Sequence, residues 1–532
     1  MKKKKRGFTL VELLAVIVIL AVILVIAVPR IMSVIKDAKL GSIESTAKLI
    51  ASTAESRYES KKALGLDVGD LKCTDVASLS NDYGKCKITF DDNGIATVVI
   101  NGKKGGKFDN LACQGTKDNM TCAEGEISTA RKCTTTDTLV NNLKFVDGQY
   151  TYTYWSYSKG WSVVLTDKES TDPVTTELCG TINDKPIVSM NSMFQNSKAT
   201  SIDVSSFDTS KVTDMSDMFN NSAATEIKGL ENFDTSEVTD MEWMFFKSQA
   251  TSLDVSSFDT SNVTNMLLMF GESATTEIKG LENFNTSKVT SMASMFSSSK
   301  ATTLDLSSFD TSNVTDMNGM FWGIAATSLD LSNFDTSNVT DMNEMFAYNK
   351  VTNLDLSSFD TSNVTSMHRM FSNSATMEIK GLENFDTSKV MDMSGMFSSS
   401  KLTSLDLSSF DTSSVTGMNS MFQGSAATSL DLSSFDTSNV TEMYGMFKSS
   451  AATSLDLSSF DTSKVTNMEQ MFFDSKATTL DLSSFNTSEV TEMRSMFSAS
   501  KATTGYARSQ EDADRFNASS NKPSGLTFVV KS

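Results

Sequence analysis

Histidine is almost absent from this chain of 532 residues, because His368 is the only one. A Ser–His–Asp or Cys–His mechanism needs histidine as its general base, and many metal centres bind through imidazole nitrogen. The sequence also contains no phosphate-binding loop and no nucleophile with a neighbouring base. We therefore expect a protein that is not an enzyme and that has no catalytic residues, no metal centre and no resident cofactor.

Net positive charge is also lacking. The formal net charge is −19, and loss of the basic residues at positions 2–6 would make the chain more acidic still. Nucleic acids bind proteins chiefly through contacts between basic side chains and phosphates. We therefore expect no nucleic-acid partner.

Cysteine occurs at six positions, all between 73 and 179, and never in a C-x-x-C pair. An even number confined to one segment favours three disulfides over a zinc site, and six buried free thiols are the alternative. Disulfides would place this segment in an oxidising compartment outside the cytoplasm. Our hypothesis is that nearest neighbours pair, as Cys73–Cys86, Cys113–Cys122 and Cys133–Cys179.

The longest apolar run, residues 8–28, follows five basic residues near the N-terminus. Its length is sufficient to span a bilayer, and the basic residues would hold the N-terminus in the cytoplasm. An ordinary cleaved signal peptide fits poorly, because the run is too long and lacks an A-x-A site. A plain membrane anchor is an alternative, but it leaves Glu12 unexplained, since a carboxylate is costly in hydrocarbon.

The segment "RGFTLVE" resembles the N-terminus of type IV prepilins and pseudopilins. In that family a basic leader ends in glycine, a prepilin peptidase cuts after it, and the new N-terminal residue is methylated. The resemblance implies a leader at 1–7, cleavage between Gly7 and Phe8, and N-methylation of Phe8. It also implies other pilin-like subunits as partners. Glu12 could offset the Phe8 amine in its own or a neighbouring subunit, which makes it the expected assembly residue.

Two different patterns follow the apolar run. Apolar residues continue at helical spacing and predict one helix over 8–62, kinked or loosened at Pro29. The segments "CKITFDDNGIATVVING" and "YTYTYWSYSKGWSVVLT" then read as β-hairpins and predict a small disulfide-bonded β-rich domain over 63–180. Trp155 and Trp161 flank the second turn, either covering a sheet face or serving as a ligand platform.

Residues 190–500 repeat with a period of 25 or 26 residues, as the phenylalanines of F-[DN]-T-S show. A fixed period of this length predicts a solenoid. In one unit, Leu304 and Leu306 would point inward from a short strand, and "VTDMNGMF" would form a short helix or helical turn. The motif M-x-x-M-F recurs thirteen times. Its methionines could bind copper, but their spacing with valine and phenylalanine favours core packing.

The L-x-L strand resembles leucine-rich repeats, although the usual ladder asparagine after the strand is missing. The units are more similar to BspA-like repeats of bacterial surface proteins, which implies a binding or adhesive scaffold without catalysis. The expected fold is α+β, with a pilin-like helix, a β-rich head and a leucine-rich-repeat-like β/α solenoid. That solenoid would have about 12 to 13 coils over 181–503, followed by a C-terminal cap at 504–532.

One outward column of the predicted strands is acidic and is interrupted by Lys228, Lys279 and Lys380. A solvated charged face is one interpretation. The other is a concave surface that recruits Ca²⁺ or a cationic ligand. The candidate binding residues in this column are Asp305, Asp330, Asp355, Asp406, Asp431, Asp456 and Asp481.

Together these features predict a pilin-like protein that crosses the cytoplasmic membrane once and reaches the cell surface or an extracellular filament. It would display the solenoid for adhesion or ligand binding, as a minor or tip subunit of a type IV-type filament. Its ligand would lie outside the cell or on a host surface. The alternatives are a pseudopilin of a secretion or DNA-uptake system, and a helix-anchored adhesin that never polymerises.

Overall fold

The computed structural model describes residues 10–65, 71–79, 82–91, 93–103, 105–125 and 130–531, with side chains from residue 32 onward except at positions 74 and 85. The expected cleavage site at Gly7 and Phe8 lies outside the described residues, as does the side chain of Glu12. The chain forms two compact units, Met1–Ala130 and Arg131–Ser532.

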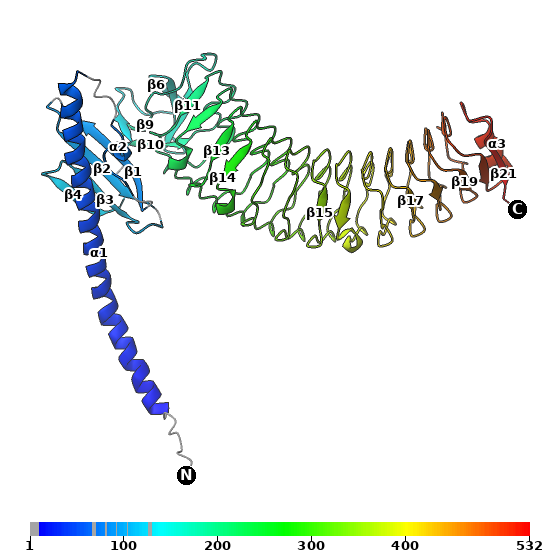
Figure 1. The fold of residues 1–532 in the computed structure, drawn as a ribbon, viewed down its shortest axis with the longest axis horizontal. Helices are drawn as coiled ribbons and strands as arrows, with labels where there is room; N and C mark the ends of the chain where they lie inside the picture. Colours follow the sequence, from blue (N-terminus) through cyan, green and yellow to red (C-terminus); the bar gives the residue numbers. More distant parts are fainter. Residues whose placement is uncertain are drawn as a thin grey trace, which may run out of the picture. The chain divides into compact units, whose positions relative to one another are not determined.

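The first unit begins with a single long helix, α1 (Leu10–Ala63), which continues through Pro29 without interruption (Figure 1). This helix agrees with the predicted range over all residues that are described. The predicted membrane-spanning run, 8–28, falls where side chains are not described. Among the described residues, no helix has the length and apolar character needed to cross a membrane.

An antiparallel sheet packs against α1, with its four strands in chain order. Ile43, Ala47 and Ile50 lie on one side of α1 at helical spacing, and they are fully buried with Val98 and Ile100 of the sheet. A short helix, α2 (Cys73–Val76), precedes the sheet. Two disulfides, Cys73–Cys86 and Cys113–Cys122, hold this unit together. The strands are β1 (Tyr83–Phe90), β2 (Ala96–Gly102), β3 (Leu111–Gly115) and β4 (Met120–Glu124).

The second unit opens with a six-stranded sheet in the order β5-β9-β10-β8-β7-β6. A disulfide joins Cys133 to Cys179, so all three cysteine pairs are nearest neighbours in the sequence. The strands are β5 (Arg131–Cys133), β6 (Leu143–Asp147), β7 (Tyr150–Trp155), β8 (Gly160–Leu165), β9 (Cys179–Ile182) and β10 (Lys185–Ser189).

This sheet shares its core with the repeats. The ring of Tyr150 lies 5.9 Å from that of Phe207 in the first coils, and Trp161 is fully buried with its Nε1 donating to the carbonyl of Ile182. Trp161 is therefore a core residue and not a ligand platform. Because residues 131–180 pack with the solenoid, the observed unit boundary lies at 130, earlier than the expected boundary at 180.

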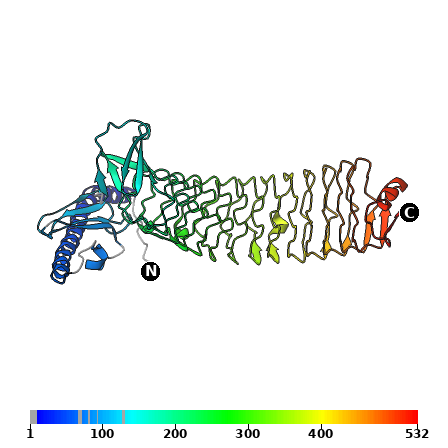
Figure 2. The same ribbon diagram turned by 90° about the horizontal axis from the view of Figure 1, so that it is seen from above.

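Residues 190–500 form a β-solenoid whose coils follow one another as a single stack (Figure 2). Short parallel strands pair in register between neighbouring coils. A second ladder of isolated parallel bridges runs without a break from Ser189 to Glu492. The paired strands are β11 (Ser201–Asp203), β12 (Glu226–Lys228), β13 (Ser252–Asp254), β14 (Glu277–Lys279), β15 (Asn353–Asp355), β16 (Glu378–Lys380), β17 (Ser429–Leu430), β18 (Ser454–Leu455) and β19 (Thr479–Leu482).

The sequence predicts either a short helix or a helical turn for each M-x-x-M-F segment. In the structure these segments form turns. In the coil of Met317 and Met320, for example, Gly319 and Gly323 both have positive φ angles, of 59° and 62°. A right-handed helix cannot continue through such residues. The array is therefore a β-solenoid with little helix, limited in the described coils to the 3₁₀ turns η1 (Leu230–Asn232), η2 (Leu281–Asn283) and η3 (Leu382–Asn384).

The methionines of M-x-x-M-F lie in the core, buried throughout except for the half-buried Met493. The phenylalanines that follow them stack from Phe194 to Phe497, with neighbouring ring centroids 5.3 to 6.1 Å apart. Burial of each such side chain contributes about 1.5–3 kcal/mol. The core-packing interpretation of the methionines is therefore confirmed.

A buried threonine joins each coil to the next. Thr311 of F-D-T-S donates through Oγ1 to the carbonyl of Asp335 at 2.8 Å and accepts the Asp335 N–H at 2.9 Å. The same threonine of every coil from Thr209 to Thr487 is at most 1% exposed. Asparagine side chains also link neighbouring coils. Asn338 Nδ2, for example, donates to the Ser312 carbonyl at 2.7 Å.

The C-terminal cap consists of β20 (Thr504–Ala507), α3 (Gln510–Asn517) and β21 (Thr527–Val530). β20 pairs in parallel with β19 of the last coil, and β21 pairs in parallel with β20. Ala513 and Phe516 of α3 are fully buried against the core. The cap thus covers the apolar end that a further coil would otherwise cover.

Candidate binding surface of the solenoid

The seven predicted binding aspartates lie in one column on the strand side of the coils. Six of them are exposed and Asp481 is half-buried, whereas neighbouring residues such as Leu306 and Leu407 are buried. The parallel register places residues of this column directly opposite one another, as at Asp355 and Lys380. The alternation expected from the L-x-L pattern is therefore present.

Each of these seven aspartates also stabilises a turn by accepting a hydrogen bond from the serine two residues later. The sequence analysis did not predict this role. Asp431 Oδ1 accepts the N–H of Ser433 at 3.1 Å and its hydroxyl at 2.7 Å. The Ser433 hydroxyl, followed by its N–H, lowers the pKa of Asp431, while the charge of Asp406 opposes this effect. The D-x-S spacing is the sequence signal for such a turn. The recurrence of aspartate thus has a structural cause.

One of the lysines that interrupt the acidic column forms an ion pair with it. Lys380 Nζ lies 2.7 Å from Asp355 Oδ2 in the preceding coil, and this hydrogen bond lowers the pKa of Asp355 to about 2. Lys228 instead lies 3.2 Å from Glu226 of its own strand. At the C-terminal end Lys531 pairs with Asp481.

Lys228, Lys279 and Lys380 belong to the "EIKGLENF" coils, whose backbone turns differently after the strand. Where other coils use aspartate and serine, these coils have a glycine followed by a 3₁₀ turn, and this variant accounts for their additional residue. Gly229 has a φ of 92°, and a Cβ there would lie 2.3 Å from the Ser205 backbone nitrogen. A glycine is therefore required at this position.

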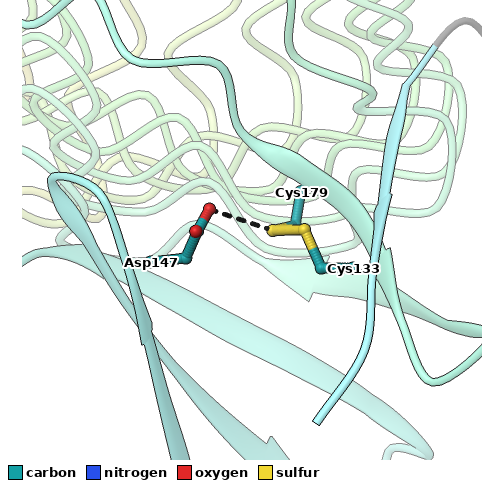
Figure 3. A group of neighbouring side chains, drawn as sticks. All are labelled: Cys133, Asp147 and Cys179. Carbon is teal, nitrogen blue, oxygen red and sulfur yellow. Dashed lines mark hydrogen bonds between the residues drawn. A yellow bond between two sulfur atoms is a disulfide. The ribbon is translucent and has the colours of Figure 1, made fainter.

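Within the described residues, one group of three potential metal ligands gathers within 4.8 Å, and it lies outside the acidic column. It consists of Cys133, Asp147 and Cys179 (Figure 3). Both sulfurs are in a disulfide, so neither is available as a thiolate, and the 3.4 Å between Cys179 Sγ and Asp147 Oδ2 is a contact without a proton. Asp147 also binds Arg131 with both oxygens, at 2.6 and 3.2 Å. This group does not suit a metal ion.

Two family models match the chain. Residues 2–28 match the "Prokaryotic N-terminal methylation motif", which implies processing by a prepilin peptidase and export to the membrane or surface. Residues 188–304, 270–380, 297–404, 373–457 and 400–508 match the model described as "Mycoplasma protein of unknown function, DUF285". No curated protein matches the chain. Because the repeat matches together span more than half of its length, the chain belongs to this DUF285 family and carries a prepilin-type N-terminus.

Proposed function

We propose that this chain is a pilin-like surface protein that displays its solenoid to bind a ligand outside the cell, without catalysis. The leader would be removed after Gly7, Phe8 would be methylated, and α1 would join a type IV-type filament. The observation that carries this proposal is the methylation motif at 2–28 in the same chain as the repeats. The resemblance of the repeats to BspA-like surface proteins supports adhesion to a host or other external surface.

The exposed side chains of α1 support assembly. Met32, Val34 and Ile35 are 65%, 68% and 50% exposed, whereas Ile43 and Ala47 further along are buried against the sheet. Apolar side chains on a helix gain stability when another subunit covers them. Neighbouring copies of α1 would provide that cover, with Glu12 fixing their register against the Phe8 amine. A head of this size suits a minor or tip subunit.

The test is mass spectrometry of the N-terminal peptide from native surface material, together with a Glu12→Ala variant. We expect a mature chain that begins at N-methylated Phe8, and loss of filament incorporation in the variant. An intact leader would contradict processing and leave a helix-anchored adhesin. A processed chain that stays in the membrane beside a secretion or uptake apparatus would instead indicate a pseudopilin.

A further inference from the structure

Two columns of exposed threonines run along the solenoid, and both are interrupted in the same coil. One column runs from Thr200 to Thr503 and the other from Thr213 to Thr491, and their exceptions are Met377 and Met391. These methionine side chains are 62% and 53% exposed. In the described coils the only other large apolar side chain exposed to this degree is Tyr348, two repeat units before Met377. The large exposed apolar side chains of the described coils thus lie within residues 348–391.

A hollow of about 180 Å³ lies between the coil of Met377 and the coil that follows it, and β16 forms part of its lining. Its deepest residues, Leu382 and Leu402, are buried, and Ile379 and Leu405 are half-buried. Leu402 stands where the coils after the other two EIKGLENF segments have alanine. The floor of the hollow is therefore apolar.

The threonine-to-threonine backbone ladder is also open at this place, as it is before Thr327 and Thr352. After the other two EIKGLENF segments, Thr251 and Thr302 donate their N–H groups to the threonine carbonyls of the preceding coil at 3.1 and 3.3 Å. The equivalent residues, Thr403 and Met377, share no backbone hydrogen bond in the described structure. The gap between these two coils is thus not closed by the ladder.

Three carboxylates, those of Glu378, Glu383 and Asp406, belong to exposed residues that line the hollow. The adjacent cation, Lys380, lies against Asp355 of the preceding coil at 2.7 Å. An apolar floor beneath carboxylates is complementary to a long aliphatic side chain that ends in a cation. Small-molecule sites usually have volumes of about 300–1,000 Å³, so this smaller hollow matches a single side chain.

We propose that the coils around Met377 dock a protein partner that inserts a lysine side chain into this hollow. The lysine stem packs along Leu382, Leu405 and Met377, and its ammonium group meets the carboxylates of the rim. This inference rests on the proposed function as a binding scaffold, and it adds the site and the chemistry of the partner.

The test uses the full chain in detergent micelles with ¹³C-methyl-labelled methionine. Acetyl-Ala-Leu-Lys-Leu-Ala-amide is titrated, and the same peptide with norleucine in place of lysine serves as the control ligand. Met377→Thr assigns the methyl signal and restores the threonine of the column. We expect a saturable shift of the Met377 methyl with the lysine peptide and affinity at least about threefold lower for the norleucine peptide.

Glu378→Gln is expected to weaken binding of the lysine peptide by about threefold to fivefold. Glu277→Gln, the same position in the β14 coil, is the matched control and leaves binding unchanged. An unmoved Met377 methyl, equal affinity for both peptides, or equal effects of the two variants would overturn the proposal. None of these readouts depends on filament assembly, so failure here leaves the proposed function standing, and failure of Phe8 methylation leaves this site untouched.

Discussion

Asp512 accepts the hydrogen bonds of Thr487, whose equivalents in the inner coils bond to the next coil. In the inner coils the ladder threonine donates to a backbone carbonyl, whereas Thr487 Oγ1 donates to Asp512 Oδ1 at 2.7 Å, and its N–H donates to the same oxygen at 3.1 Å. Asp512 is 2% exposed, and Arg508 Nε binds its other oxygen at 3.0 Å. A side chain of α3 therefore satisfies the donors that the last coil leaves open.

Asp512→Ala is expected to loosen the C-terminal end of the array first. The change leaves two buried donors of Thr487 unpaired, at a cost of about 1–3 kcal/mol each. Hydrogen–deuterium exchange should become faster in the last coil while the coils near Thr311 stay protected, because each coil contacts only its neighbours. Asp514→Ala, an exposed position on the same helix, is the control. Uniform loss of protection along the array would contradict this view of the cap.

Thr311→Val is expected to destabilise the solenoid, although the two side chains have nearly the same shape. The part-buried hydrogen bond from the Asp335 N–H loses its acceptor, and such a loss costs about 1–3 kcal/mol. Urea unfolding followed by circular dichroism measures the difference. Thr315→Val, in an exposed column four residues later, should change stability by less than about 0.5 kcal/mol. Equal effects of the two variants would show that the ladder bonds contribute no more than surface threonines do.

Asp431→Asn and Asp431→Ala separate the two roles of the acidic column. Asparagine keeps an oxygen for Ser433 and removes the charge, so its melting temperature should match that of the unchanged chain. Alanine removes the turn contact as well, and we expect its melting temperature to fall below that of the asparagine variant. If asparagine destabilises as much as alanine does, charge and not the turn explains the recurrence of aspartate.

Asp316→Asn should stabilise the chain at neutral pH and not at pH 3. Burial raises the pKa of Asp316, with a further contribution from Asp341 in the next coil. A carboxyl group whose pKa is raised by folding favours the folded state below its unfolded pKa and loses that contribution as pH rises. The expected gain at neutral pH is on the order of 0.5 kcal/mol, measured by thermal unfolding at both pH values. The sequence already has asparagine at this position in other coils, at Asn265 and Asn467. A gain of equal size at pH 3 would contradict the titration argument.

The solenoid features that sequence reasoning predicted correctly are those with a fixed period. Methionine, valine and phenylalanine recur at constant spacing, and stacked coils have one way of burying them all. The threonine ladder was not predicted, because threonine is usually exposed and the partner of Thr311 is a backbone group in the next coil. A contact of this kind becomes visible only when the coils are placed in register.

The boundary between the two units at residue 130 shows a different limit of prediction from sequence. The hairpins around Thr89 and Thr153 have similar local patterns, yet the first packs against α1 and the second joins the repeat core. Local alternation predicts a strand and its buried face, but not which other part of the chain covers that face. The turn made by Asp431 was visible as a D-x-S spacing, and it was overlooked because charge offered a second explanation.

The repeated F-[DN]-T-S threonine also makes the length of the protein adjustable. Every coil from Thr209 to Thr487 presents the same buried threonine to whatever follows it, and the α3 cap uses this threonine of the last coil. Deleting or duplicating one unit of 25 residues would change the reach of the array by about 4.8 Å without creating a new interface. Unequal recombination within the repeats would thus change the length of the solenoid.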